Sequence, residues 1–168
     1  MKINIKHACS FTGHRPERMS EPEKKVKAWL KEQIGKAIEE GYTDFISGMQ
    51  RGVDIWAAEA VLELKEAGKN VRLFAASAFK GMELEWDVKW QERYSMILSA
   101  AEEVFYISNI PGRAAFFKRN DWMVDHSSKL IGVYTGAPGG TKETIEYAKK
   151  KGLEIVLYEK EGKSGKGK

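Results

Sequence analysis

The sequence predicts an α/β fold with a mostly parallel sheet, and three observations lead to this prediction. Short apolar runs alternate with longer segments of helical periodicity almost to the end of the chain. Three of the apolar runs lead directly into loops that carry glycine. The length of 168 residues suits one domain with a sizeable core. We place that domain at residues 1–158 and expect the lysine-rich segment 159–168 to be a disordered basic tail.

The first half of the chain predicts three strands and two helices. The first helix carries Val26, Leu30 and Ile34 in one core-facing stripe, and Gly41 is expected to end it. The second helix has the most regular apolar period in the chain. In order, the elements are a strand at His7–Phe11, a helix at Glu21–Glu40, a strand at Thr43–Ser47, a helix at Val53–Leu64 and a strand at Val71–Ala75.

The second half predicts three helices and three strands. Trp86, Trp90 and Tyr94 recur at four-residue spacing in the third helix, which favours a packing face over a stacking platform for a purine. The last helix ends in three lysines, which suit the negative end of its dipole. In order, the elements are a helix at Glu83–Ala100, a strand at Glu103–Ile107, a helix at Ala115–Ser128, a strand at Leu130–Tyr134, a helix at Thr141–Lys151 and a strand at Leu153–Tyr158.

Composition excludes several classes of protein. One cysteine excludes an internal disulfide framework and fits a reducing cytosol. The N-terminus has no apolar signal core and no run reaches membrane-spanning length, so we predict a cytoplasmic protein without membrane contact. The net charge of +4 gives only weak support to a nucleic-acid partner. No pattern typical of a metal site is present, and no metal is predicted.

Three glycine-bearing loops follow predicted strands and carry the candidate ligand site. The loop at Gly139-Gly140 lets backbone amides approach an anion closely, and Thr141 is expected to cap the helix that follows. The other two loops are Thr12–Pro16 and Gly48–Asp54. Because the carboxyl ends of parallel strands meet at one edge of a sheet, the three loops should converge there on an anionic, nucleotide-like ligand.

Polar residues in these loops have a functional and a structural interpretation. Arg15, held extended by Pro16, suits a phosphate or a carboxylate, although a surface arginine is an equal alternative. Asp54 either accepts hydrogen bonds from ribose hydroxyls or compensates the dipole of its helix. His14 more often represents a solvated or capping group than an acid or a base.

Several motifs together resemble the YpsA-like branch of the SLOG superfamily. They are Ser10-Phe11-Thr12-Gly13-His14-Arg15-Pro16, Ser47-Gly48-Met49-Gln50-Arg51-Gly52-Val53-Asp54, Arg119-Asn120-Asp121-Trp122-Met123-Val124-Asp125-His126-Ser127 and Gly139-Gly140-Thr141. The resemblance spans residues 7 to about 158. It implies a Rossmann-like three-layer sandwich and a nucleotide-derived ligand, with NAD or ADP-ribose derivatives as candidate types. Relatives include the DNA-processing protein DprA and the Lonely-guy phosphoribohydrolases.

The resemblance and the glycine loops together define the predicted ligand site. No cofactor is assigned with it beyond the nucleotide-like ligand. The predicted site residues are Thr12, Gly13, His14, Arg15, Gly48, Arg51, Asp54, Glu59, Arg119, Asn120, Gly136, Gly139, Gly140 and Thr141.

Three functions compete, and the sequence favours a cytosolic protein that binds or senses a nucleotide or nucleotide-sugar. The first alternative is a phosphoribohydrolase that cleaves the N-glycosidic bond of a nucleoside monophosphate, with Glu59 or Glu143 as the candidate carboxylate. In the Lonely-guy motif a glutamate stands three residues after the threonine, whereas here that position is Thr144. The second alternative is DprA-like binding of single-stranded DNA.

We also expect a homo-oligomer. SLOG relatives associate, and the helix that carries Trp86, Trp90 and Tyr94 holds more apolar surface than one packing face requires. An exposed aromatic patch of this kind usually marks an interface.

Overall fold

The computed structural model describes residues 2–136 and 138–159. Six strands form one sheet in the order β4-β3-β2-β1-β5-β6, and every neighbouring pair is parallel. The strands are β1 (Ala8–Gly13), β2 (Asp44–Ser47), β3 (Arg72–Ser77), β4 (Glu103–Tyr106), β5 (Lys129–Val133) and β6 (Glu154–Leu157). The predicted class and the six-strand count are confirmed.

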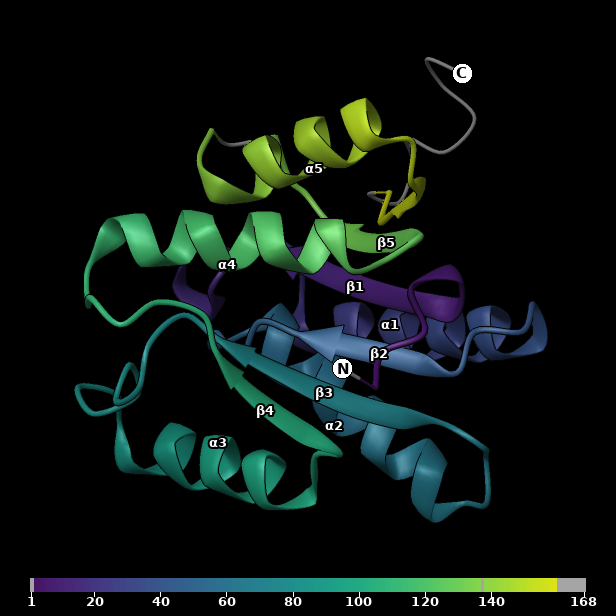
Figure 1. The fold of residues 1–168 in the computed structure, drawn as a ribbon, viewed down its shortest axis with the longest axis horizontal. Helices are drawn as coiled ribbons and strands as arrows, with labels where there is room; N and C mark the ends of the chain where they lie inside the picture. The colour runs from purple at the N-terminus through teal and green to yellow at the C-terminus, as the bar shows by residue number, and fades with distance from the viewer. Residues whose placement is uncertain (1, 137, 160–168) are drawn as a thin grey trace.

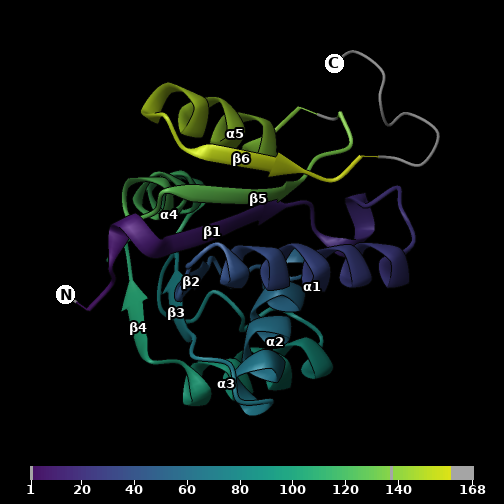
Figure 2. The same ribbon diagram turned by 90° about the vertical axis from the view of Figure 1, so that its right-hand side faces the viewer.

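Five helices cover the two faces of the sheet, with α1, α2 and α3 on one face and α4 and α5 on the other (Figures 1 and 2). This division follows from the strand order, because right-handed crossovers that run in opposite directions place their helices on opposite faces. The helices are α1 (Glu23–Glu39), α2 (Val53–Glu66), α3 (Val88–Ala100), α4 (Arg113–Asp125) and α5 (Gly140–Lys151). The result is the predicted Rossmann-like three-layer sandwich.

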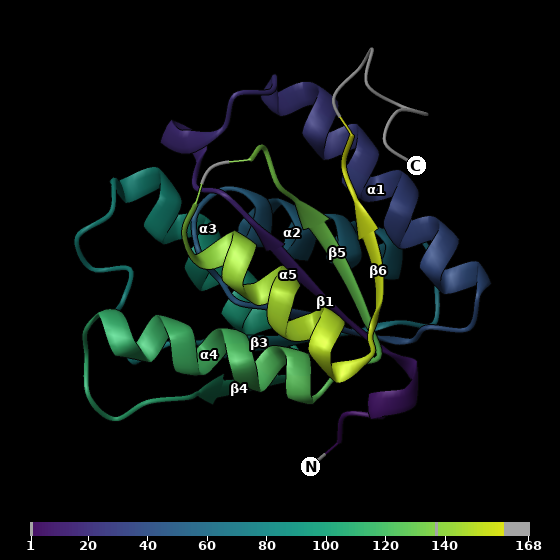
Figure 3. The ribbon, with the colours of Figure 1, turned by 90° about the horizontal axis from the view of Figure 1, so that it is seen from above.

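The direction of the chain reverses at β1. From β1 to β4 each strand is added on one side, and the chain then crosses back through α4 to place β5 against the other side of β1. In Figure 3 the loop after β1 and the loop after β5 lie side by side at the end of the sheet to which the arrows point. Ligands of open α/β sheets bind at such a switch point.

The largest difference from the predicted element boundaries is at α3. The helix was expected from Glu83, but Asp87 is its N-cap and accepts a hydrogen bond from the Lys89 amide at 3.4 Å. Residues 83–86 form turns. The sequence pattern did not show this boundary, because Trp86 continues the four-residue spacing although it precedes the helix.

The aromatic stripe on α3 packs inward and is not an exposed patch. Tyr94 is buried, and its hydroxyl oxygen is 2.5 Å from that of Ser77. The Trp86 ring packs edge-on against the Tyr94 ring, with 5.5 Å between the ring centroids. Trp86 and Trp90 are half-buried. The exposed apolar side chains near this helix are Leu84, Val88 and Met96, so the aromatic basis for the predicted homo-oligomer is wrong and the oligomer itself stays a prediction.

Candidate functional site

A cavity of about 620 Å³ lies at the carboxyl edge of the sheet, beside the switch point. It is formed by the end of β1 and the loop after it, by the start of α2, by the first two turns of α4 and by the loop that leads into α5. Its lining residues are Phe11, Thr12, Gly13, His14, Arg15, Arg18, Gln50, Asp54, Gly112, Arg113, Phe116, Phe117, Arg119, Asn120, Pro138, Gly139, Gly140 and Thr141.

Most of the predicted site residues meet in this cavity, although they come from segments far apart in the sequence. The structure brings ten of the fourteen together: Thr12, Gly13, His14, Arg15, Asp54, Arg119, Asn120, Gly139, Gly140 and Thr141. Four do not line it: Gly48, Arg51, Glu59 and Gly136. Gly136 is an exposed loop residue with φ of 99°.

Gly48 lies directly behind the cavity lining. A Cβ at this position would be 2.8 Å from Asp54 Oδ2 and 3.0 Å from Arg119 Cδ. Glycine is therefore required so that both charged side chains can pack against the backbone of the loop after β2. Arg51, also predicted at the ligand, instead forms an ion pair with Glu17 at 2.9 Å.

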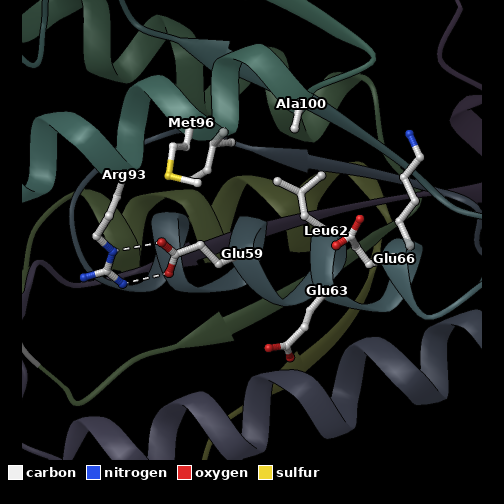
Figure 4. A pocket seen from close by; sticks show the side chains of 9 residues that line it. Glu59, Leu62, Glu63, Glu66, Arg93, Met96 and Ala100 are labelled. Carbon is white, nitrogen blue, oxygen red and sulfur yellow. Dashed lines mark hydrogen bonds and ion pairs between the residues drawn. The ribbon is translucent and has the colours of Figure 1, made fainter.

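Glu59 lies in a different hollow, a groove of about 730 Å³ between α2 and α3. Figure 4 shows its carboxylate paired with Arg93, with oxygen–nitrogen distances of 2.7 and 2.8 Å. Leu62, Met96 and Ala100 are apolar residues of the same groove. The fold thus places Glu59, a predicted site residue, outside the cavity, because five residues along α2 from Asp54 the helix presents a different side.

Glu143, the other candidate carboxylate, does not line the cavity either. It is exposed in the first turn of α5. Thr144 is buried instead, and its hydroxyl donates a hydrogen bond to the Gly140 carbonyl at 2.8 Å. Neither glutamate proposed for glycosidic cleavage is therefore brought to the cavity by the fold.

Arg119 is the most deeply placed cation of the cavity. Its side chain extends from α4, only 4% of the residue is exposed, and it donates hydrogen bonds to the Gly48 carbonyl and to Asn120 Oδ1. The bond to Asn120, 2.8 Å long, orients that side chain. A Cβ at Gly140 would stand 3.7 Å from Asn120 Nδ2, so the amide donors of Asn120 point toward the start of α5.

The guanidinium of Arg119 retains donors for a ligand. Two of its five N–H groups are accounted for by Gly48 and Asn120. Burial alone lowers the pKa of Arg119, and the nearby Asp54 raises it, but an arginine stays charged in proteins. A buried cation with open donors favours an anion in the cavity.

Asp54 is the one carboxylate among the described residues that line the cavity. Burial raises its pKa to about 6, while Arg119 and a hydrogen bond from the Gln50 amide act in the opposite direction. His14 is also buried, and its pKa is lowered by that burial and by Arg18. Its Nε2 accepts a hydrogen bond from the Thr135 amide at 3.4 Å, so the imidazole is neutral and links the loops after β1 and β5.

The loop after β2, which packs beside Asp54 and Arg119, has a strained backbone conformation. Met49 is buried and has φ of 66°, a conformation that costs an L-residue about 1–2 kcal/mol. The Met49 amide donates to Ser47 Oγ at 3.1 Å, and Ser47 Oγ donates to the Asp54 carbonyl at 2.8 Å. These bonds fix the loop against the first turn of α2.

The glycines of the cavity serve different purposes. A Cβ at Gly13 would stand no more than 2.8 Å from three atoms of the Val53 side chain, so Gly13 is required for close packing of β1 on α2. Gly139 has φ of 135° and is the N-cap of α5, with no protein atom near its missing Cβ. The predicted capping role of Thr141 is wrong, because Thr141 lies inside the helix, two residues after its cap.

Sequence reasoning missed the contribution of α4 to the mouth of the cavity. Arg113, Phe116 and Phe117 line it from the first two turns of α4, and Arg18 lines it from the loop after β1. The Arg119 guanidinium lies 5.5 Å from the Phe116 ring centroid, and that of Arg113 lies 5.9 Å from the Phe117 centroid. The signal in the sequence was Gly112, which precedes the helix as glycine does in the other loops, followed by Arg113 at the first position of α4.

Among the helices of the described residues, none is long and apolar enough to span a bilayer. No three His, Cys, Asp or Glu side chains within residues 2–136 and 138–159 are grouped to hold a metal ion.

Comparison with sequence families and proteins gives consistent matches. The YspA SLOG family matches residues 9–159. A UPF0398 protein of Halalkalibacterium halodurans is 33% identical over 129 residues, which cover 75% of this chain and 68% of that protein. The SPbeta prophage-derived protein YoqJ of Bacillus subtilis is 30% identical over 146 residues, which cover 77% of this chain and 85% of YoqJ.

Two solved structures of DNA processing protein A share the fold. The Streptococcus pneumoniae protein superimposes with a TM-score of 0.64 at 16% identity, over 93% of this chain but only 52% of that one. The Helicobacter pylori protein, described for its single-stranded DNA binding mode, gives 0.62 at 16% identity, over 92% of this chain and 67% of that one. The chain thus spans about half the length of the S. pneumoniae protein, and at this identity the likeness concerns the fold alone.

Proposed function

The chain belongs to the YspA SLOG family, and on that premise we propose that it is a cytosolic protein that binds a nucleotide or nucleotide-sugar in the carboxyl-edge cavity. One observation carries the proposal. The buried guanidinium of Arg119, with open donors, lines the same cavity as the glycine loop at the start of α5, beside the switch point of the sheet. Backbone amides, a helix N-terminus and a buried cation together suit a phosphate group.

Each part of the cavity has a role in this proposal. The amides of Gly139 and Gly140 and the Asn120 amide group bind the phosphate together with Arg119. Asp54 accepts hydrogen bonds from ribose hydroxyls. Phe116 and Phe117, both half-buried, offer ring faces on which a base stacks.

A binding role is better supported than hydrolysis of nucleoside monophosphates. Cleavage of a glycosidic bond needs a carboxylate set against the positive charge that develops on the ribose, and small misplacements are costly. Glu59 is paired with Arg93 in another groove, and Glu143 is exposed away from the cavity. We therefore expect release of free base from AMP to be negligible.

Binding of single-stranded DNA is a second candidate, supported by the mouth of the cavity. Phe117 and Arg113 lie together there, and an aromatic ring beside a cation is typical of single-strand binding sites. The fold shared with DNA processing protein A is consistent with this candidate.

The test is calorimetric titration of AMP, ADP and ADP-ribose into the wild-type protein and into two variants of Gly140. Gly140→Asp places a negative charge in the phosphate position and should weaken binding by at least about 100-fold, or about 2.7 kcal/mol. Gly140→Asn adds nearly the same volume without the charge and should weaken binding less. Equal affinities of wild type and Gly140→Asp would contradict the proposal.

A further inference from the structure

The seven arginines of the chain divide into two groups by their partners. Three form salt bridges, namely Arg51 with Glu17, Arg72 with Asp44 and Arg93 with Glu59. The other four all line the carboxyl-edge cavity, and none of them forms a salt bridge with another residue in the described part of the chain. They are Arg15, Arg18, Arg113 and Arg119.

The charge of the cavity exceeds what one phosphate group neutralises. Its four arginines contribute +4, and Asp54, the one carboxylate in the described lining, contributes −1 when ionised. His14 is neutral because burial lowers its pKa. A terminal phosphate carries about −1.5 to −2 at neutral pH, so one such group leaves at least one arginine without a counter-charge.

The four arginines occupy two different depths. Arg119 is buried and fixed by two hydrogen bonds, whereas Arg15, Arg18 and Arg113 are exposed. The exposed three reach the cavity from two separate segments, the loop after β1 and the first turn of α4. The cavity therefore has one arginine at its base and three at its rim.

Resting on the proposed function, we propose that the ligand is a nucleotide with two or more phosphoryl groups and a total charge of about −3 or more. One phosphoryl group binds Arg119 and the glycine loop, and the next binds the rim arginines Arg15, Arg18 and Arg113. The rim makes the protein selective for such ligands over monophosphates and over the internal diphosphate of ADP-ribose, which carries only about −2.

Titration calorimetry without magnesium and at constant ionic strength tests this selectivity with AMP, ADP, ATP and ADP-ribose. In the wild type, ADP should bind about tenfold more tightly than AMP and ADP-ribose. The triple variant Arg15→Gln, Arg18→Gln, Arg113→Gln should bind ADP no more tightly than AMP. Because the three side chains are exposed, thermal unfolding should show that this variant remains folded.

A matched control removes three charges elsewhere through Lys69→Gln, Lys149→Gln and Lys150→Gln, all of them exposed residues outside the cavity. It should retain the preference for ADP, which distinguishes local contacts from the overall charge.

Equal wild-type affinities for AMP and ADP would overturn the inference and leave the proposed function intact. Absence of binding by all four nucleotides would reject both. A single-stranded oligonucleotide that binds more tightly than any nucleotide, and loses affinity in the triple variant, would assign the rim to DNA and overturn the inference.

Discussion

The carboxyl-edge cavity and the groove between α2 and α3 are similar in size, about 620 and 730 Å³, but differ in what lines them. In the groove, Arg93 is neutralised by Glu59 through two hydrogen bonds, and two neighbouring helices supply the whole lining. In the cavity, the loop after β1 and helix α4 bring four arginines together, and none of them forms a salt bridge within residues 2–136 and 138–159. The difference teaches that the two hollows cannot be told apart by volume, and that the arginines without salt bridges beside glycine backbone are the reason to propose the cavity as the anion-binding one.

The strongest test of this comparison replaces one arginine of the cavity and, separately, one arginine of the groove by glutamine. Arg119→Gln should weaken nucleotide binding by about 100- to 1,000-fold, because a buried charged hydrogen bond to the phosphate is lost. The same substitution in the groove, Arg93→Gln, should change the affinity for the nucleotide by less than about twofold. Titration calorimetry with ADP measures both. A loss of affinity in Arg93→Gln as large as that in Arg119→Gln would contradict binding of the nucleotide in the carboxyl-edge cavity.

The next test concerns the effect of the buried Asp54 carboxyl group on the pH dependence of the free energy of unfolding. Its pKa is about 6 in the folded protein, against 3.8 for a solvated aspartate, so between pH 4 and 6 the folded state holds more protons than the unfolded state. Stability should therefore fall as the pH rises through this window, by up to about 3 kcal/mol, and level off above it.

Urea unfolding from pH 4 to 8 measures this effect as the stability of the wild type minus that of Asp54→Asn. The variant has no carboxyl group to titrate, so the titrations of the other groups cancel in the difference. The difference should decline as the pH rises to about 6. A constant difference would show that Arg119 compensates the burial of Asp54 completely.

A third test separates the glycine that packing requires, Gly13, from the glycine proposed to bind the phosphate, Gly140. Gly13→Ala should destabilise the protein by about 2 kcal/mol, since its Cβ would overlap the Val53 side chain. Val53→Ala in the same chain should restore part of that loss by removing the overlapping atoms. Gly140→Ala, whose Cβ meets only Asn120 at 3.7 Å, serves as the control and should change stability by less than about 0.5 kcal/mol. Denaturant midpoints that fail to show rescue by Val53→Ala would disprove the packing explanation.

The smallest effect is expected for Glu59→Gln. Its ion pair with Arg93 is about one-third exposed at each side chain, so its loss should cost less than about 1 kcal/mol. Nucleotide affinity should stay the same, and AMP hydrolysis should be as negligible as in the wild type. Release of adenine at an enzymatic rate by the wild type, abolished in Glu59→Gln, would establish the hydrolase alternative instead.

The sequence alone determined the layers of this protein and most of the cavity. Apolar runs and helical periodicity are local signals, so they predicted six strands and five helices with boundaries wrong mainly at α3. Glycine loops after three of the strands, β1, β2 and β5, predicted the cavity, because parallel strands bring their carboxyl ends to one edge.

Tertiary structure alone decided which charged side chains face the cavity and which are paired. Glu59 and Asp54 lie on the same helix within five residues, yet one faces α3 and the other faces the cavity. Arg51 and Arg15 both follow strands in glycine loops, but of the two only Arg51 forms a salt bridge in the described part of the chain, with Glu17 of the loop after β1. Direction and pairing depend on neighbours brought together from distant parts of the chain, and a single sequence carries no local signal for such contacts.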